Sequence, residues 1–247
     1  ITSYRVEILN LVNGQGNGQW LTLTTTGALT NTHLSLQTNT EYQYRIVAIN
    51  PYGSVISPVQ AITTFALPPT LTGVASSGST IDLSWNTITG SPTYNIYSSS
   101  NNSNFVLEQA GITATTYQDT GLALGQTVYY KISVTNAAGE GTQSGASISV
   151  TTNSLPGAPT NLSATNPVPT TARFTWTAPT DNGGASTVTY NIQRSNDNIN
   201  WDATYLTSTV TGIDDTGLTH GTQYYWKVNT VTSAGISADS NTVSYLT

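Results

Sequence analysis

The chain has 247 residues, of which only 7% are charged, and a formal net charge of −6 with six basic residues in all. Recognition of phosphates needs clustered Lys and Arg, so this composition argues against a nucleic-acid partner. The absence of cysteine excludes disulfides, a thiolate zinc site and a cysteine nucleophile.

An average soluble domain carries about 25% charged residues, far more than the 7% of this chain. Its polar surface must therefore come mainly from Thr, Ser, Asn and Gln. Thr and Tyr favour strands, and Asn, Ser, Gly and Pro favour turns, so the composition predicts an all-β protein. It is typical of a cell-surface protein, a secreted product or a virion. No apolar run approaches the roughly 18 residues of a membrane helix, and we expect no membrane insertion in this segment.

The first predicted element is a strand in ITSYRVEILN (1–10), where residues alternate with a period of two. The glycine-rich run NGQGNGQW (13–20) follows, and we expect it to be a mobile loop. A second strand is predicted within LQTNTEYQYRIVAINPYG (36–53).

The same two blocks recur twice further along the chain. TYNIYS (93–98) and LALGQTVYYKISVTNAAG (122–139) form one copy, and TYNIQR (189–194) and LTHGTQYYWKVNTVTSAG (218–235) form the other. Both later copies begin with a proline-containing lead, LPPTLTG (67–73) or LPGAPTNLS (155–163), and a strand with a Trp, TIDLSW (80–85) or ARFTWT (171–176). The chain is therefore predicted to hold three repeats.

These motifs resemble the fibronectin type III domain, a seven-stranded Greek-key sandwich. Its carriers are Trp85 and Trp176 of the second strand, the Tyr of the third strand, and the L-x-x-G-T-x-Y block before the sixth. The resemblance implies tandem immunoglobulin-like sandwiches, with domains at 1–67, 68–154 and 155–247, and with alternate strand residues filling the cores. These predicted core residues are Ile81, Leu83, Trp85, Tyr94, Ile96, Val128, Tyr130, Ile132, Val134, Tyr224, Trp226 and Val228.

The resemblance also implies a tyrosine corner, in which a Tyr hydroxyl bonds nearby backbone. The corner residues are Tyr42 and Tyr224, whereas the middle repeat has Val128 at this position. Its corner is either lost or supplied by Tyr129 or Tyr130.

The first repeat lacks the lead and the Trp strand. An open sandwich would expose its core and two sheet edges. We therefore expect the parent polypeptide to continue upstream and to supply the missing strands. The alternative is donor-strand completion by another subunit.

Motifs for catalysis are absent from the sequence. His33 and His220 fall in predicted loops, and no G-x-S-x-G, H-E-x-x-H or phosphate-binding glycine loop occurs. We expect no enzymatic activity and no cofactor. Asp119 and Asp215 each open a DTGL sequence, which we interpret as an Asx-turn. A calcium ion, if bound, would be sought first at Asp214 and Asp215.

The outward face of the third and sixth strands is the candidate interaction site. In two repeats it should present Tyr and amide side chains that could stack on sugars or meet another protein, although ordinary cross-strand pairing on a solvated sheet is the favoured explanation. The candidate residues are Tyr97, Tyr129 and Lys131, beside Asn95, in the middle repeat, and Tyr225 and Lys227, beside Gln193, in the third.

The function expected from the sequence is structural. We predict a non-catalytic, semi-rigid spacer and assembly or adhesion module of an extracellular surface protein, filament or virion appendage. Its partners would be other copies of itself, neighbouring surface or virion proteins, or glycans. The alternatives are an accessory linker region of a secreted polysaccharide-degrading enzyme and an adhesin or receptor ectodomain.

Overall fold

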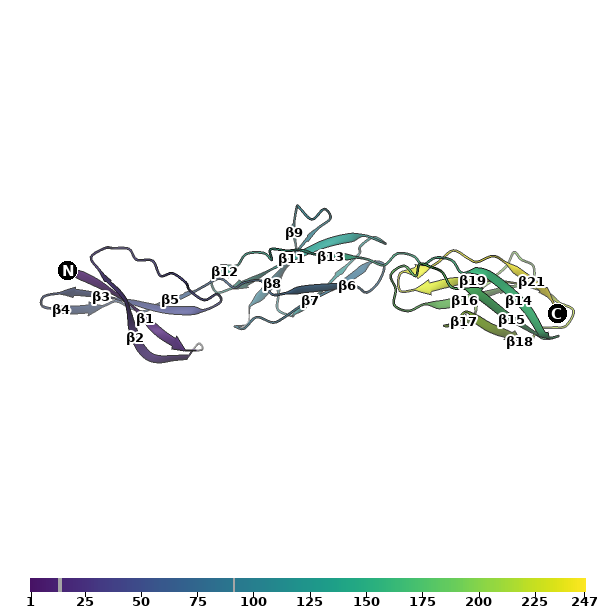
Figure 1. Cartoon of the computed structure of the whole chain (residues 1–247), viewed down its shortest axis with the longest axis horizontal. Coiled ribbons are helices and arrows are strands. Elements are labelled where there is room, and N and C mark those ends of the chain that lie inside the picture. Colours follow the sequence, from purple (N-terminus) through teal and green to yellow (C-terminus); the bar gives the residue numbers. More distant parts are fainter. Residues whose placement is uncertain (13–14, 91) are drawn as a thin grey trace. The chain divides into compact units, whose positions relative to one another are not determined.

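The computed structural model describes residues 1–12, 15–90 and 92–247, and the side chains in these ranges except those of 10–12, 15–17, 166–168 and 203. Every regular element in this part of the chain is a β-strand, and the strands form five antiparallel sheets (Figure 1). The predicted all-β fold class is confirmed. Among the described residues, no helix is long and apolar enough to cross a membrane.

The first repeat forms one five-stranded sheet. Its strands are β1 (Ser3–Val12), β2 (Gln15–Thr26), β3 (Glu41–Asn50), β4 (Gly53–Ile56) and β5 (Gln60–Thr63), in the order β2-β1-β3-β4 with β5 also paired to β3. The expected loop at 13–20 is wrong for residues 15–20, which lie in β2 and pair with β1 from Val12–Gln15 onward. Residues 13–14 lie outside the described residues. Backbone hydrogen bonds to β1 hold these residues in a strand, although their glycine-rich composition is typical of a loop.

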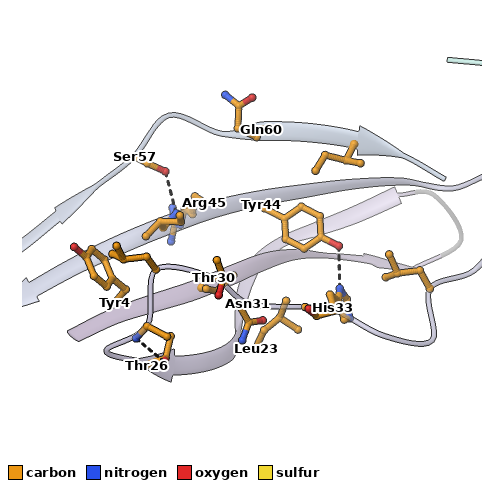
Figure 2. Close-up of a pocket in the computed structure, with 17 residues that line it drawn as sticks. Tyr4, Leu23, Thr26, Thr30, Asn31, His33, Tyr44, Arg45, Ser57 and Gln60 are labelled. Carbon is orange, nitrogen blue, oxygen red and sulfur yellow. Dashed lines mark hydrogen bonds between the residues drawn. The ribbon is translucent and has the colours of Figure 1, made fainter. Parts of the chain in front are cut away.

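One face of this sheet is not covered by a second sheet within the described part of 1–67. A hollow of about 650 Å³ lies along it, as Figure 2 shows. Apolar side chains such as Tyr4, Leu23 and Tyr44 line the hollow, and residues 28–33 border it. The face corresponds to the interior of the other two repeats, as the missing-strand interpretation predicts. That strands encoded upstream, or donated by another subunit, cover this face stays a prediction.

The middle repeat contributes two sheets. The smaller has β6 (Leu71–Ala75), β7 (Thr80–Trp85) and β10 (Thr116–Thr120), in the order β10-β7-β6. The larger has β8 (Thr93–Ser99), β9 (Val106–Ile112), β11 (Thr127–Asn136), β12 (Gly139–Glu140) and β13 (Ile148–Thr151), in the order β12-β11-β8-β9 with β13 paired to β11. Trp85 and Tyr94, one from each sheet, meet edge to face with ring centroids 5.4 Å apart.

The third repeat has the same arrangement. Its smaller sheet is β14 (Thr160–Val168), β15 (Thr171–Thr177) and β18 (Gly212–Thr216), in the order β14-β15-β18. Its larger sheet is β16 (Thr189–Ser195), β17 (Asp202–Ser208), β19 (Gln223–Thr232), β20 (Gly235–Ile236) and β21 (Val243–Leu246), in the order β17-β16-β19-β20 with β21 paired to β19. Trp176 and Tyr190 repeat the edge-to-face contact at 5.2 Å.

The predicted cores of the middle and third repeats are confirmed, since all twelve predicted core side chains are buried. The period of two explains this success, because alternate residues of a strand face the same side of the sheet. Burial of each large apolar side chain contributes roughly 1.5–3 kcal/mol, which lets such sandwiches fold without disulfides.

The tyrosine corners at Tyr42 and Tyr224 are confirmed. The backbone N–H of Gln37 donates to the Tyr42 hydroxyl at 2.9 Å, and that of Thr219 donates to the Tyr224 hydroxyl at 3.2 Å. In the middle repeat the equivalent N–H belongs to Ala123, and it donates to the side-chain oxygen of Gln126 at 2.8 Å. An amide two residues before Val128 thus takes the role of the missing hydroxyl.

A threonine directly after the last strand of each repeat secures the corner loop, which the sequence analysis missed. The Thr64, Thr152 and Thr247 hydroxyls accept from the backbone N–H of Thr40, Gln126 and Thr222 at 2.9–3.0 Å. Each hydroxyl also donates to a loop carbonyl, that of Gln37, Ala123 or Thr219. The loop is therefore held from both sides by one side chain.

The backbone divides into two compact units, one formed by residues 1–72, 84–117 and 129–148 and the other by 73–83, 118–128 and 149–247. The division crosses the middle repeat, whereas the predicted boundaries after residues 67 and 154 lie inside the units. The three-domain division at 1–67, 68–154 and 155–247 therefore stays a prediction.

Candidate interaction faces of the five-stranded sheets

The outward face of the middle repeat brings two of its candidate residues directly together. The pairing of β11 with β8 places Lys131 opposite Tyr97, and Tyr129 opposite Ser99. All three candidate side chains are half-buried. Asn95, next to them, is buried and accepts a bond from the Gly111 backbone N–H at 3.0 Å.

Glu140 is the acidic centre of this face, and the sequence analysis missed it. Its Oε1 accepts hydrogen bonds from the hydroxyls of Ser133 and Tyr97. These bonds, the one from Ser133 first, lower the pKa of the Glu140 carboxyl. Burial, followed by the bond to Glu140, raises the pKa of Tyr97. The carboxylate is therefore fully charged at neutral pH, and Tyr97 keeps its proton.

The third repeat has a related but different arrangement. Lys227 lies opposite Gln193, and Tyr225 opposite Ser195. The Lys227 ammonium contacts the Asp239 carboxylate at 2.7 Å, and the Asn229 amide donates to the same carboxylate at 3.1 Å. The positive charge on this face is thus paired within the face itself.

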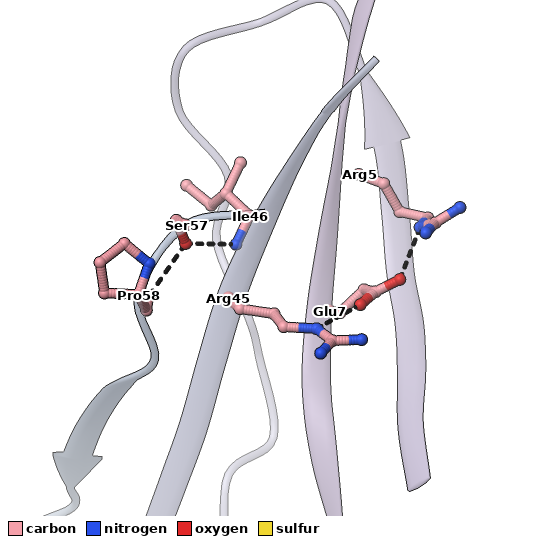
Figure 3. A network of polar contacts seen from close by, with 6 residues as sticks. All are labelled: Arg5, Glu7, Arg45, Ile46, Ser57 and Pro58. Carbon is pink, nitrogen blue, oxygen red and sulfur yellow. Dashed lines mark hydrogen bonds and ion pairs between the residues drawn. The ribbon is translucent and has the colours of Figure 1, made fainter. Parts of the chain in front are cut away.

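The first repeat has the most strongly paired face, although no candidate residue was predicted there. Glu7 is only 4% exposed and lies between two arginines, with the Arg5 Nε at 2.6 Å and the Arg45 Nε at 2.7 Å (Figure 3). Burial acts to raise the pKa of Glu7, but the hydrogen bonds and charges of Arg45 and Arg5 outweigh it, so the pKa is lowered. Glu7 and Arg45 are direct partners across β1 and β3.

A cation over an aromatic ring recurs in all three repeats. The Arg45 guanidinium lies 4.2 Å from the Trp20 ring centroid, the Lys131 ammonium 4.8 Å from Phe105, and the Lys227 ammonium 4.5 Å from Trp201. The three cations are equivalent, since each comes three residues after the corner position at 42, 128 or 224. We call these pairs the aromatic–cation sites. A basic residue at this fixed offset was the sequence signal that could have found them.

Two of the aromatic rings are carried by loops of the same construction. The Asn101 side-chain oxygen accepts from the backbone N–H of Ser103 and Asn104, both at 3.0 Å, four residues before Phe105. Asp197 accepts from Ile199 and Asn200 at 2.9 and 2.8 Å, four residues before Trp201. Asn102 and Asn198 have positive φ angles of 58° and 59°, as such turns need. Each ring therefore follows a locally fixed turn.

The structure contradicts the Asx-turn interpretation at Asp215. This side chain is 1% exposed and accepts from the Trp226 indole N–H at 3.0 Å and the Tyr205 hydroxyl at 3.1 Å. The Arg194 guanidinium lies 3.6 Å away. The Asp215 carboxylate therefore binds side chains of other strands, and it does not cap its own turn. Asp119, at the equivalent position, is also buried.

The other residues considered for chemistry are engaged in pairwise contacts. Asp214 forms an ion pair with Arg173 at 3.0 Å on the exposed face of β15 and β18. His33 Nδ1 lies 2.9 Å from the Tyr44 hydroxyl, and His220 lies on an exposed turn. In residues 1–12, 15–90 and 92–247, no three His, Cys, Asp or Glu side chains are grouped to hold a metal ion.

Residues 157–245 match the family model of the fibronectin type III domain. This segment is a fibronectin type III domain. Its bounds enclose nearly the whole of the third repeat, including Trp176 and the corner at Tyr224. For the first and middle repeats, membership of the fibronectin type III family stays a prediction that rests on the shared motifs and on the equivalent corner loops.

The chain is also similar to segments of two curated proteins. It is 31% identical to chitinase A1 of Niallia circulans over 227 residues, covering 87% of this chain and 30% of that protein. It is 29% identical to endoglucanase B of Cellulomonas fimi over 265 residues, covering 94% of this chain and 24% of that protein. The chain thus spans less than a third of the length of these relatives.

Among solved structures, the chain is similar to the FN1–FN3 domains of chicken CNTN1, with 17% identity, a TM-score of 0.46, and coverage of 100% of this chain and 90% of that one. It is also similar to domains A168–A170 of titin, with 15% identity, a TM-score of 0.46, and coverage of 98% and 88%.

Proposed function

We propose that this chain is a non-catalytic accessory region of a secreted polysaccharide-degrading enzyme, in which fibronectin type III modules separate functional domains. The observation that carries the proposal is the extent of the similarity to a chitinase and an endoglucanase, which runs through 87% and 94% of this chain. Because the similarity extends over all three repeats, it supports a shared segment of several modules rather than one shared domain.

The side chains of the described residues support a role outside catalysis. Glu7, Asp214, Asp215 and Asp239 each have a basic partner, which leaves them poorly suited to act as a general acid and a nucleophile. Glycoside hydrolysis needs two carboxyl groups facing one bond with their pKa values driven apart. Here the pKa values of Glu7 and Glu140 are both lowered. The chain would act by separating and presenting its neighbours in the extracellular space.

The comparisons favour an accessory region of an enzyme over the surface protein, filament or virion appendage predicted from the sequence. That prediction rested on the repeats alone, and proteins that share one fold can have unrelated functions. The adhesin or receptor alternative likewise has only the module type in its favour.

The reading frame on either side of the chain tests the proposal most directly. We expect it to encode a glycoside hydrolase domain or a carbohydrate-binding module. Deleting residues 1–247 from that protein should lower the rate on insoluble polysaccharide and leave the rate on a soluble substrate unchanged, because the deletion leaves the catalytic domain intact. The purified chain should release no reducing sugar. Flanking virion or surface-repeat sequences, or hydrolysis by the chain itself, would overturn the proposal.

A further inference from the structure

The aromatic–cation sites recur at equivalent places on the outward faces of all three five-stranded sheets. The sites are Trp20 with Arg45, Phe105 with Lys131, and Trp201 with Lys227. Stability alone does not require an aromatic residue here, because the cores of the middle and third repeats are filled by other side chains. A solvent-facing feature that recurs in every repeat therefore calls for an explanation in terms of binding.

The rings are open to a ligand. Trp20, Phe105 and Trp201 are each half-buried, so each residue keeps part of its surface in contact with solvent. A cation occupies one face of a ring at most, and the turns before Phe105 and Trp201 fix the backbone that carries the ring. An aromatic surface that is already ordered loses little conformational entropy on binding.

The cations of the first and third sites are each paired with a nearby carboxylate. Glu7 pairs with Arg45 at 2.7 Å, and Asp239 pairs with Lys227 at 2.7 Å. A face with paired charges has little field with which to attract a nucleic acid or an anionic polymer. A neutral ligand with many hydroxyl groups fits it better, since hydroxyls can bond to carboxylate, amide and phenol groups without displacing an ion pair.

From these observations we propose that the aromatic–cation sites bind a neutral polysaccharide chain, one sugar-stacking site in each repeat. A pyranose ring has an apolar C–H face that can lie on an aromatic ring by dispersion and hydrophobic contact. Its hydroxyls would meet polar groups beside the ring, such as Tyr97 and Gln193, which lie directly across from Lys131 and Lys227.

Each site is small, so its own affinity is low, and the three sites act together. On an insoluble polymer the ligand repeats along the surface, and a second or third contact becomes intramolecular once the first has formed. The proposal rests on the proposed function, because accessory modules of a polysaccharide-degrading enzyme work next to such a surface. It adds that the chain itself contacts the substrate.

The test is binding of the whole chain to microcrystalline cellulose and to chitin powder, measured as the bound fraction after sedimentation. We expect the unmodified chain to bind at least one of them. Trp201→Ala should weaken the binding by about fivefold or more, as truncation of a central interface residue does. Trp20→Ala, Phe105→Ala and Trp201→Ala combined should abolish it. Tyr52→Ala is the matched control, because Tyr52 is 98% exposed on a turn outside these sites, and its binding should be unchanged.

A second measurement keeps the test valid if an alanine variant loses its fold. Acrylamide quenching of the unmodified chain should fall when cellohexaose or chitohexaose is added, because a stacked sugar shields Trp20 and Trp201. No binding by the unmodified chain, or equal binding by the triple variant with its melting temperature preserved, would overturn the proposal. So would binding to anionic polysaccharides alone. The accessory role is tested separately by the flanking reading frame, and it survives a failure to bind.

Discussion

The first and third repeats have equivalent strands in their larger sheets, but among the described residues only the third has a second sheet against it. On the outward face, equivalent positions are alike: Val47 is 1% exposed, and Asn229 is 4% exposed. On the inward face they differ, because Ile46 is 47% exposed and Val228 is 0% exposed. A strand pattern thus decides which side chains share a face, whereas the covering sheet decides whether that face becomes a core.

The largest effect should appear when the two repeats are produced alone. Residues 155–247 should give a monomer with one cooperative thermal transition, because both sheets are present and the core cluster is closed. Residues 1–67 alone should be unfolded or aggregate, since the hollow of about 650 Å³ leaves apolar side chains uncovered. Size-exclusion chromatography and circular dichroism can measure both. A cooperative, monomeric fragment 1–67 would contradict the comparison.

The next effect concerns the contribution of the second sheet. Trp176→Ala should destabilise the third repeat by about 3–5 kcal/mol in chemical denaturation, because it removes a large buried side chain of β15. Trp176→Phe should cost distinctly less, since the indole N–H makes no hydrogen bond among the described residues. Trp201→Ala, on the outward face, should also cost much less. Equal losses for Trp176 and Trp201 would show that the two faces are assigned wrongly.

A matched pair of substitutions tests the inward face directly. Val228→Thr keeps the shape of the side chain and buries a hydroxyl, so it should cost about 1–3 kcal/mol. Ile46→Thr at the equivalent position should change the stability of the first repeat little and reduce aggregation, because that position is already exposed. A large loss of stability at Ile46, measured in the whole chain by thermal unfolding, would indicate that this face is covered.

These differences also explain how much the sequence predicts. The alternation in TIDLSW and TYNIYS is local, and it correctly placed Trp85 and Tyr94 in the core. The corner tyrosines were implied by the resemblance to the fibronectin type III domain, and the Tyr224 hydroxyl indeed reaches a backbone N–H only five residues away. Composition and periodicity are therefore sufficient for the fold class and the cores, whereas the corners required the family resemblance.

Side-chain contacts between distant strands were harder to predict from the sequence. Asp215 bonds to Trp226 and Tyr205, and a pattern that contains only DTGL gives no information about those partners. The strand at 15–20 was read as a loop because glycine composition conceals pairing with β1. At two of the aromatic–cation sites the ring lies on a loop, and at the third it lies on a neighbouring strand, so which ring meets the cation depends on strand register. The candidate face was therefore located, but its rings were missed.

A smaller effect distinguishes the corners of the third and middle repeats. Tyr224→Phe leaves the Thr219 N–H without its acceptor and should destabilise the third repeat by about 1 kcal/mol. In the middle repeat Gln126→Ala should have an effect of similar size, because its amide replaces the hydroxyl. Chemical denaturation of the whole chain, followed by Trp fluorescence and compared with the unmodified chain, measures both. No change in the Gln126 variant would contradict the substitution of amide for hydroxyl.

The smallest effect lies in the turns before the aromatic rings and is a dependence on pH. Hydrogen bonds from the backbone N–H groups of Asn200 and Ile199 hold the pKa of the Asp197 carboxyl well below its ordinary value of 3.8. A lowered pKa in the folded state means that the stabilisation is complete above pH 3.8 and is lost as the pH falls toward the folded pKa. Order at Trp201 should therefore decrease in acid while order at Phe105 does not, because the equivalent turn uses the neutral Asn101.

Asp197→Asn is the matched variant for this last comparison, since it gives the third repeat the acceptor that the middle repeat already has. It should keep the turn and remove its dependence on pH, whereas Asp197→Ala should loosen the turn at every pH. Amide hydrogen exchange at Ile199 and Asn200, measured between pH 2 and pH 6 and corrected for the intrinsic rate, reports the order of the turn. If protection in the Asn variant falls in acid as steeply as in the unmodified chain, Asp197 is not the titrating group. A carboxylate and an amide are then interchangeable in this loop, and the difference between the two repeats must arise elsewhere.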